Sequence, residues 1–160
     1  MADQTGAGAT LAIGTTLAAT TIGEFEGDAY DVVGLVESIG PFGDTRTSVT
    51  FISLGDGRVR KSRGSADAGD MVVTYAFEAA GDDGQDALKT AFETASQSAD
   101  EFNFRVSFND QITPTTGNPT NFYFKAKIMS RQVQEVTTDG TILVQATLGI
   151  NSPILEEAAV

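Results

Sequence analysis

Residues 102–108 read FNFRVSF, and this stretch decides the fold. Phe102, Phe104, Val106 and Phe108 alternate with polar residues, which is the period of a β-strand with one buried face. Similar strand-like segments span residues 30–36, 48–54, 71–78, 122–128 and 142–150. The sequence therefore predicts a mainly β chain, an antiparallel β-sandwich or barrel-like fold. A turn at residues 139–140, Asp-Gly, predicts a hairpin before the last strand.

A single helix is predicted near residues 84–98. Leu88, Ala91, Phe92 and Ala95 recur at helical spacing, and Asp82 or Asp83 is placed to cap its first turn. The apolar stripe is narrow, so we expect the helix to pack on the outer side of a sheet rather than inside a helical bundle.

The two ends of the chain differ in composition from the middle. Residues 1–27 are rich in Ala, Gly and Thr and are predicted to form an N-terminal arm and a first strand. The alternatives are that this segment orders on a neighbouring chain, or that it is a frayed terminus followed by a strand of the same chain. Residues 151–160 are predicted to be a C-terminal arm after a domain at residues 28–150. The candidate arm anchors are Leu11, Ile13, Ile154 and Leu155.

The amino-acid composition excludes several classes of function. The 160 residues contain no Cys, His or Trp, so disulfides, thiolate or imidazole metal sites and Ser-His-Asp catalysis are excluded. Acidic turns at residues 56–57 and 67–70 lack the ligand spacing of a calcium loop. Paired carboxylates are the remaining acid–base chemistry, and no spacing marks such a pair. We therefore expect no catalytic residues, no metal and no cofactor.

The charge of the chain is unevenly distributed. There are 22 acidic and 10 basic residues, a formal net charge of −12, which repels nucleic acid and anionic membranes on average. No apolar run approaches the length of a membrane span and no basic leader precedes one, so we expect neither membrane insertion nor a signal peptide.

Four of the ten basic residues fall within six positions: Arg58, Arg60, Lys61 and Arg63. This run could contact an acidic surface on another copy of the chain, or bind a phosphate. A solvent-exposed hairpin rim is the more common fate of such a run, and the sequence alone favours it.

One long stretch resembles a known family. Residues 54–92, LGDGRVRKSRGSADAGDMVVTYAFEAAGDDGQDALKTAF, resemble the tail tube proteins of long-tailed phages and phage-like gene transfer agents. The resemblance rests on the turn and basic hairpin at 55–64, DAGDM at 67–71 and DGQDAL at 83–88. VGLVESIGPFG at residues 33–43 and the MADQ start fit the same pattern.

This resemblance implies a structural protein. Members of the family assemble six to a ring, and rings stack into a hollow tube whose lumen holds the tape-measure protein and conducts DNA. The resemblance implies an acidic lumen, arms and a loop at residues 54–70 that contact the next ring, and the four basic residues as the loop contacts. Tail terminator or distal tail proteins would be further partners, in a virion tail or gene transfer agent particle assembled in the bacterial host cytoplasm.

Two other functions remain open at this point. One is the tube subunit of a contractile, type VI-like secretion system, which has a similar fold and ring. The other is an acidic β-sandwich binding module for carbohydrate or for adhesion.

Overall fold

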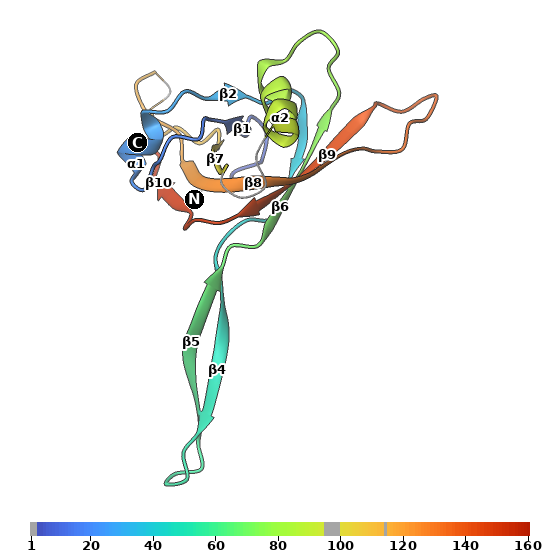
Figure 1. The fold of residues 1–160 in the computed structure, drawn as a ribbon. Coiled ribbons are helices and arrows are strands. Elements are labelled where there is room, and N and C mark those ends of the chain that lie inside the picture. Colours follow the sequence, from blue (N-terminus) through green and yellow to red (C-terminus); the bar gives the residue numbers. More distant parts are fainter. Residues whose placement is uncertain (1–2, 95–99, 114) are drawn as a thin grey trace.

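The chain folds into two parts of very different shape. The computed structural model describes residues 3–94, 100–113 and 115–160. A long two-stranded hairpin, β4 (Thr45–Ile52) and β5 (Val59–Asp67), projects from a curved sheet (Figure 1). We call residues 45–67 the hairpin and the rest of the described chain the head. The fold is mainly β and antiparallel, as the sequence predicts.

The head is built on one eight-stranded sheet, and every strand pairing in its described residues is antiparallel. Across the sheet the strands follow the order β2 (Asp31–Val32), β1 (Thr10–Ile13), β7 (Phe102–Ser107), β8 (Asn121–Val133), β9 (Leu143–Ile150), β6 (Asp70–Ala76) and β3 (Val36–Ile39), with β10 (Leu155–Glu157) added beside β8. The turn at residues 139–140 lies in the β8–β9 hairpin, as predicted.

The alternation that predicted these strands also selects the core. Phe104 and Val106 on β7 are fully buried, and Phe104 stacks on its cross-strand partner Phe124 with ring centroids 5.8 Å apart. Phe42, from the loop before the hairpin, packs edge-on against Phe122, with ring centroids 5.2 Å apart. Aromatic pairs of this kind add to the free energy of burial.

The two edges of the sheet are joined by three residues. β2 and β3 lie at opposite edges, yet only residues 33–35 separate them in sequence, so the sheet must curl until its edges meet. The Val33 N–H donates to the Leu11 carbonyl at 2.8 Å, and the Ala76 N–H donates to the Leu35 carbonyl at 2.9 Å. Leu35 adopts a left-handed backbone, φ 55°. The single strand predicted at residues 30–36 is therefore wrong, because the chain changes edge there.

Helix α2 (Asp83–Thr94) lies over this seam. Asp82 caps it by accepting from the Gln85 N–H at 2.9 Å, and Leu88 and Ala91 are buried in the core of the barrel. The predicted helix is confirmed as far as Thr94, and its predicted last residues, 95–98, lie outside the described part.

The Gln85 side chain ties the helix to the seam. Its Nε2 donates to the carbonyls of Gly34 at 3.0 Å and Ala76 at 2.9 Å, and its Oε1 accepts from the Glu78 N–H at 3.1 Å. A buried amide with these three bonds satisfies backbone groups that the irregular seam leaves without a sheet partner.

The segments near the two ends pack on the other face of the sheet. A short helix, α1 (Ile22–Glu26), places Phe25 against Tyr123 with ring centroids 5.7 Å apart. The sequence analysis did not predict this helix, although Thr21 and Glu24 form a capping box. Asp28 fixes the preceding loop by accepting from the Thr15 N–H and hydroxyl at 2.8 and 2.6 Å.

The seam gives a prediction about stability. Replacing Gln85 with Ala leaves buried backbone groups without partners, so the free energy of unfolding should fall by about 1–3 kcal/mol. Lys89→Ala on the exposed side of the same helix is the matched control and should change it little. Urea denaturation followed by circular dichroism measures both, and equal effects of the two substitutions would contradict the role given to Gln85.

Candidate functional site

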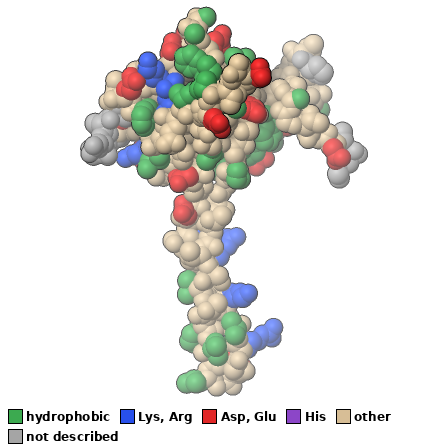
Figure 2. Space-filling view, turned by 90° about the vertical axis from the view of Figure 1, so that its right-hand side faces the viewer, with side chains coloured by type: hydrophobic (Ala, Val, Ile, Leu, Met, Phe, Trp, Pro, Cys, Tyr) green, Lys and Arg blue, Asp and Glu red, His purple; other side chains and the backbone are tan. Residues whose placement is uncertain are grey.

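The hairpin is the most unusual surface of the molecule. Every residue of β4 and every residue of β5 except Gly64 is exposed. Nine residues of β5 span roughly 30 Å at the rise of an extended strand, and Figure 2 shows this shaft standing clear of the head. A two-stranded hairpin is only marginally stable alone, so a surface that covers it would add to its stability.

Strand register divides the hairpin side chains between two faces. Ser48 pairs with Arg63, Thr50 with Lys61 and Ile52 with Val59, and paired residues lie on the same face. The opposite face carries the pairs Val49–Ser62 and Phe51–Arg60. The four basic residues predicted as contacts therefore do not form one patch, because Lys61 and Arg63 lie on one face and Arg60 on the other.

The turn at the end of the hairpin holds one of these residues. Asp56 accepts from the Arg58 N–H at 3.1 Å and from Arg60 Nη2 at 2.9 Å. The Arg60 side chain, followed by the Arg58 N–H, lowers the pKa of the Asp56 carboxyl. Among the described residues this is the one ion pair, so Lys61 and Arg63 have no carboxylate partner there.

Large apolar side chains are also exposed along the hairpin. Leu54 at the turn is fully exposed, and Phe51 and Ile52 are 64% and 61% exposed. Val49 and Val59 are about half exposed. A cluster of this kind marks a surface that another protein covers. The sequence analysis weighed only the charges and missed this feature, although SVTFISL at residues 48–54 carries it.

The hairpin and the head carry opposite charge. The hairpin has five basic and two acidic residues: Arg46, Arg58, Arg60, Lys61, Arg63, Asp56 and Asp67. The remainder of the chain has 20 acidic and five basic residues. A hairpin of one copy is therefore electrostatically attracted to the head of another.

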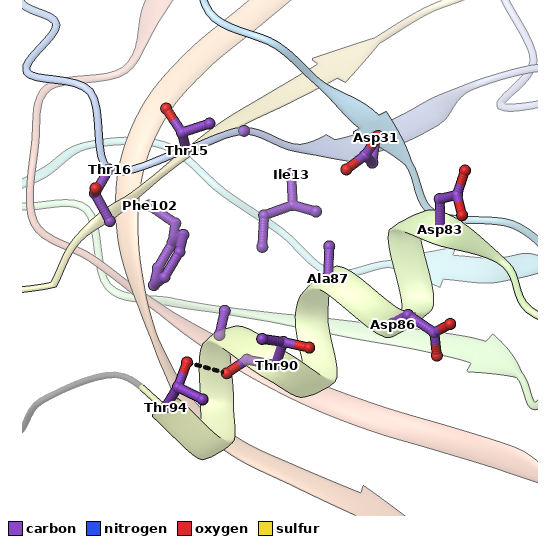
Figure 3. A pocket seen from close by; sticks show the side chains of 12 residues that line it. Ile13, Thr15, Thr16, Asp31, Asp83, Asp86, Ala87, Thr90, Thr94 and Phe102 are labelled. Atoms are coloured by element: carbon purple, nitrogen blue, oxygen red, sulfur yellow. Dashed lines mark hydrogen bonds between the residues drawn. The ribbon is translucent and has the colours of Figure 1, made fainter.

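A groove of about 500 Å³ lies beside α2 (Figure 3). Ile13, Ala87 and Phe102 form an apolar floor, and three exposed aspartates stand at one end: Asp31, Asp83 and Asp86. In Figure 1, α2 is at the end of the head away from the hairpin. The sequence analysis did not find this groove, because its residues come from four separate segments of the chain.

A second groove of about 450 Å³ lies beside β3. Ile39, Phe42 and Phe108 line it, and Glu37 is the charged residue at its border. It is as apolar as the groove beside α2, and it carries one acidic side chain where the other carries three.

The four candidate arm anchors all pack within their own chain. Leu11 and Ile13 are fully buried in β1, inside the main sheet. Ile154 packs against the main core and Leu155 against Phe25 and Tyr123, each half-buried. In this structure the arms are therefore ordered on the head of the same chain.

Two carboxylates meet where these arms cross. The charge of Glu157, and a hydrogen bond to it, raise the pKa of Glu26. Glu157 also accepts from Asn121 Nδ2 at 3.1 Å and from the Tyr123 hydroxyl at 3.3 Å. Burial, followed by the charges of Glu157 and Glu26, raises the pKa of Tyr123 to about 12.

The described residues contain no cluster of three or more acidic side chains arranged to hold a metal ion. No helix among them has the length and apolar character needed to cross a membrane.

The comparisons with known proteins give the fold. No protein-family model and no curated protein matches the sequence. The SPP1 tail tube superimposes with a TM-score of 0.68 at 16% identity, over 98% of this chain and 80% of that one. The tail of an empty GTA particle gives 0.62 at 13% identity, over 98% and 100%. The sheath–tube complex of the PVC extracellular contractile injection system gives 0.66 at 9%, over 94% and 88%.

The chain thus has the fold of tail tube proteins, as the sequence resemblance implied. The three solved structures are of a tail tube, a tail and a sheath–tube complex, and none is described as an enzyme.

The carboxylate pair at the arms gives a prediction about pH. Because the pKa of Glu26 is raised in the folded chain, its ionised form opposes folding at neutral pH. Glu26→Gln should therefore raise the melting temperature at pH 7, and the gain should vanish below about pH 4, where the carboxyl is protonated in both states. Glu156→Gln, on the same strand as Glu157, is the control. If Glu26→Gln and the native protein melted at the same temperature at pH 7, the unfavourable interaction of Glu26 with Glu157 would be contradicted.

Proposed function

We propose that this protein is the subunit of a phage-type tail tube. Six copies form a ring, and rings stack into a hollow tube in a virion tail or a gene transfer agent particle. The lumen holds the tape-measure protein and conducts DNA, and the ends of the tube bind terminator or distal tail proteins. The similarity to the fold of tail tube proteins, which extends over nearly the whole chain, supports this proposal.

The observation that carries the proposal is the hairpin. It exposes large apolar side chains over a shaft that projects from the head, which is unfavourable for a protein that remains a monomer. Contact with copies in the next ring would bury these side chains and place Arg58, Arg60, Lys61 and Arg63 against acidic groups. Copies with a net charge of −12 repel one another on average, and the basic residues of the hairpin supply the opposite charge that a contact between them needs.

The acidity of the head fits a channel for DNA. With 20 acidic and five basic residues outside the hairpin, a lumen formed by heads repels the phosphate backbone. DNA then passes without the counterion release that drives binding to basic surfaces.

A second candidate is the tube of a contractile injection system. The match to the PVC sheath–tube complex, at a TM-score of 0.66, favours it to nearly the same degree. The two functions differ in whether a contractile sheath surrounds the tube, so binding of a sheath protein encoded beside this chain separates them.

The proposal predicts an assembly that is visible by electron microscopy. The purified protein at increasing concentration should form six-fold rings or stacked hollow tubes in negative stain. A monomer that persists at all concentrations, also after a preformed tail tip is added, would contradict the proposal.

Reversing charge on the hairpin should block growth of the tube. Arg60→Glu with Lys61→Glu replaces attraction to the acidic heads by repulsion, while the exposed positions leave the fold intact. Sedimentation should show at least a tenfold loss of assembled protein, with an unchanged circular dichroism spectrum. Lys89→Glu together with Lys127→Glu, an equal change of charge on the head, is the control. Tubes formed as readily as by the native protein would refute the part assigned to these residues.

A further inference from the structure

The groove beside α2 matches one face of the hairpin in both polarity and charge. On the hairpin, the apolar pair Ile52–Val59 is followed toward the head by Lys61 and then Arg63. In the groove, the apolar floor at Ile13, Ala87 and Phe102, to which Ala91 also belongs, is followed by the aspartates. Each surface therefore changes from apolar to charged along its length, with opposite sign of charge.

The spacing of the two patterns also agrees. Lys61 and Arg63 lie about 7 and 13 Å from Val59 along an extended strand. Asp86 and Asp83 lie about 7.5 and 12 Å from Ala91 along the axis of α2. With Val59 at the level of Ala91 along the helix axis, Lys61 is therefore at the level of Asp86 and Arg63 at the level of Asp83.

The cross-strand neighbours leave this contact open. Lys61 and Arg63 pair with the short side chains of Thr50 and Ser48, so nothing large stands beside them on that face. Asp31, Asp83 and Asp86 are exposed and have no ion pair among the described residues. Both sets of charges are free to form new pairs.

The geometry points to the groove beside α2 as the receptor for the hairpin of a second copy, with Ile52 and Val59 on its apolar floor and Lys61 and Arg63 at its aspartates. This inference rests on the proposed function and names the surface through which the copies join. The hairpin and α2, which lines the groove, lie at opposite ends of the molecule (Figure 1). The contact therefore joins two unlike surfaces, so it can repeat from copy to copy instead of closing a symmetric dimer.

The groove beside β3 is the competing receptor. It is apolar, but Glu37 is its one acidic residue, and it lies close to the base of the hairpin in the chain, since β3 ends at Ile39 and β4 begins at Thr45. Charge complementarity therefore selects the groove beside α2.

The test uses two full-length variants with reversed charge. The hairpin variant is Lys61→Glu with Arg63→Glu, and the groove variant is Asp83→Lys with Asp86→Lys. Each variant alone brings like charges together and should assemble at least tenfold less than the native protein in sedimentation velocity. An equimolar mixture should recover assembly, because the acidic hairpin enters the basic groove and the remaining native surfaces still match.

Controls distinguish this contact from a general effect of charge. Arg46→Glu at the base of the hairpin and Glu37→Lys beside β3 should each assemble as the native protein does. Circular dichroism melts check folding, and Asp31→Lys replaces the groove variant if α2 does not tolerate two lysines. Rescue in the mixture is a readout that a merely misfolded variant cannot give.

The outcomes separate the inference from the proposed function. Normal assembly by the groove variant, a mixture that stays unassembled, or a block by Glu37→Lys would each overturn the groove assignment while tubes of the native protein keep the proposed function. Native protein without tubes would oppose the proposed function, and hetero-association of the two variants would still support the groove.

Discussion

The three-residue crossing between β2 and β3 is the constraint on which the rest of the structure depends. Residues 33–35 leave one edge of the sheet and enter the other, so a flat sheet is impossible and the strands curl around a shared core. Gln85 of α2 satisfies the Gly34 carbonyl in the crossing and the Ala76 carbonyl at the end of β6. The position of α2, and with it the groove beside it, follows from this requirement.

The hairpin, in contrast, lies outside the core of the head. It begins soon after β3 and returns directly to β6, so its two ends are fixed by the barrel while its length is free of the core. Side chains in β6 of the head alternate between buried and partly buried, whereas those of the hairpin are exposed on both faces. A segment that gains little from its own core would gain stability from a surface that covers it, as in the contact proposed above.

The sequence revealed the parts of the fold whose side chains have two distinct environments. Strands β6 and β9 alternate cleanly because one face is core and the other is not, and α2 shows the same contrast at helical spacing. In β7 the buried Asn103 interrupts this alternation. The strand predicted at residues 30–36 failed because its β-branched residues are shared between two edges. Leu11 and Ile13, predicted as arm anchors, lie in β1, where the flanking strands β2 and β7 pair with the segment and the core surrounds both side chains. The groove was beyond sequence reasoning, since Asp31 approaches Asp83 only after the barrel closes.

The free edges of the hairpin have a consequence for how the protein avoids aggregation. Both outer edges of β4 and β5 present backbone groups that another strand could pair with, beside exposed Phe51 and Ile52. Charged side chains are a common protection of such edges. Five basic residues on every hairpin keep two hairpins from adding to each other, while leaving each one attracted to an acidic head. The charges that would guide the proposed contact would thus also oppose edge-to-edge pairing of hairpins before assembly.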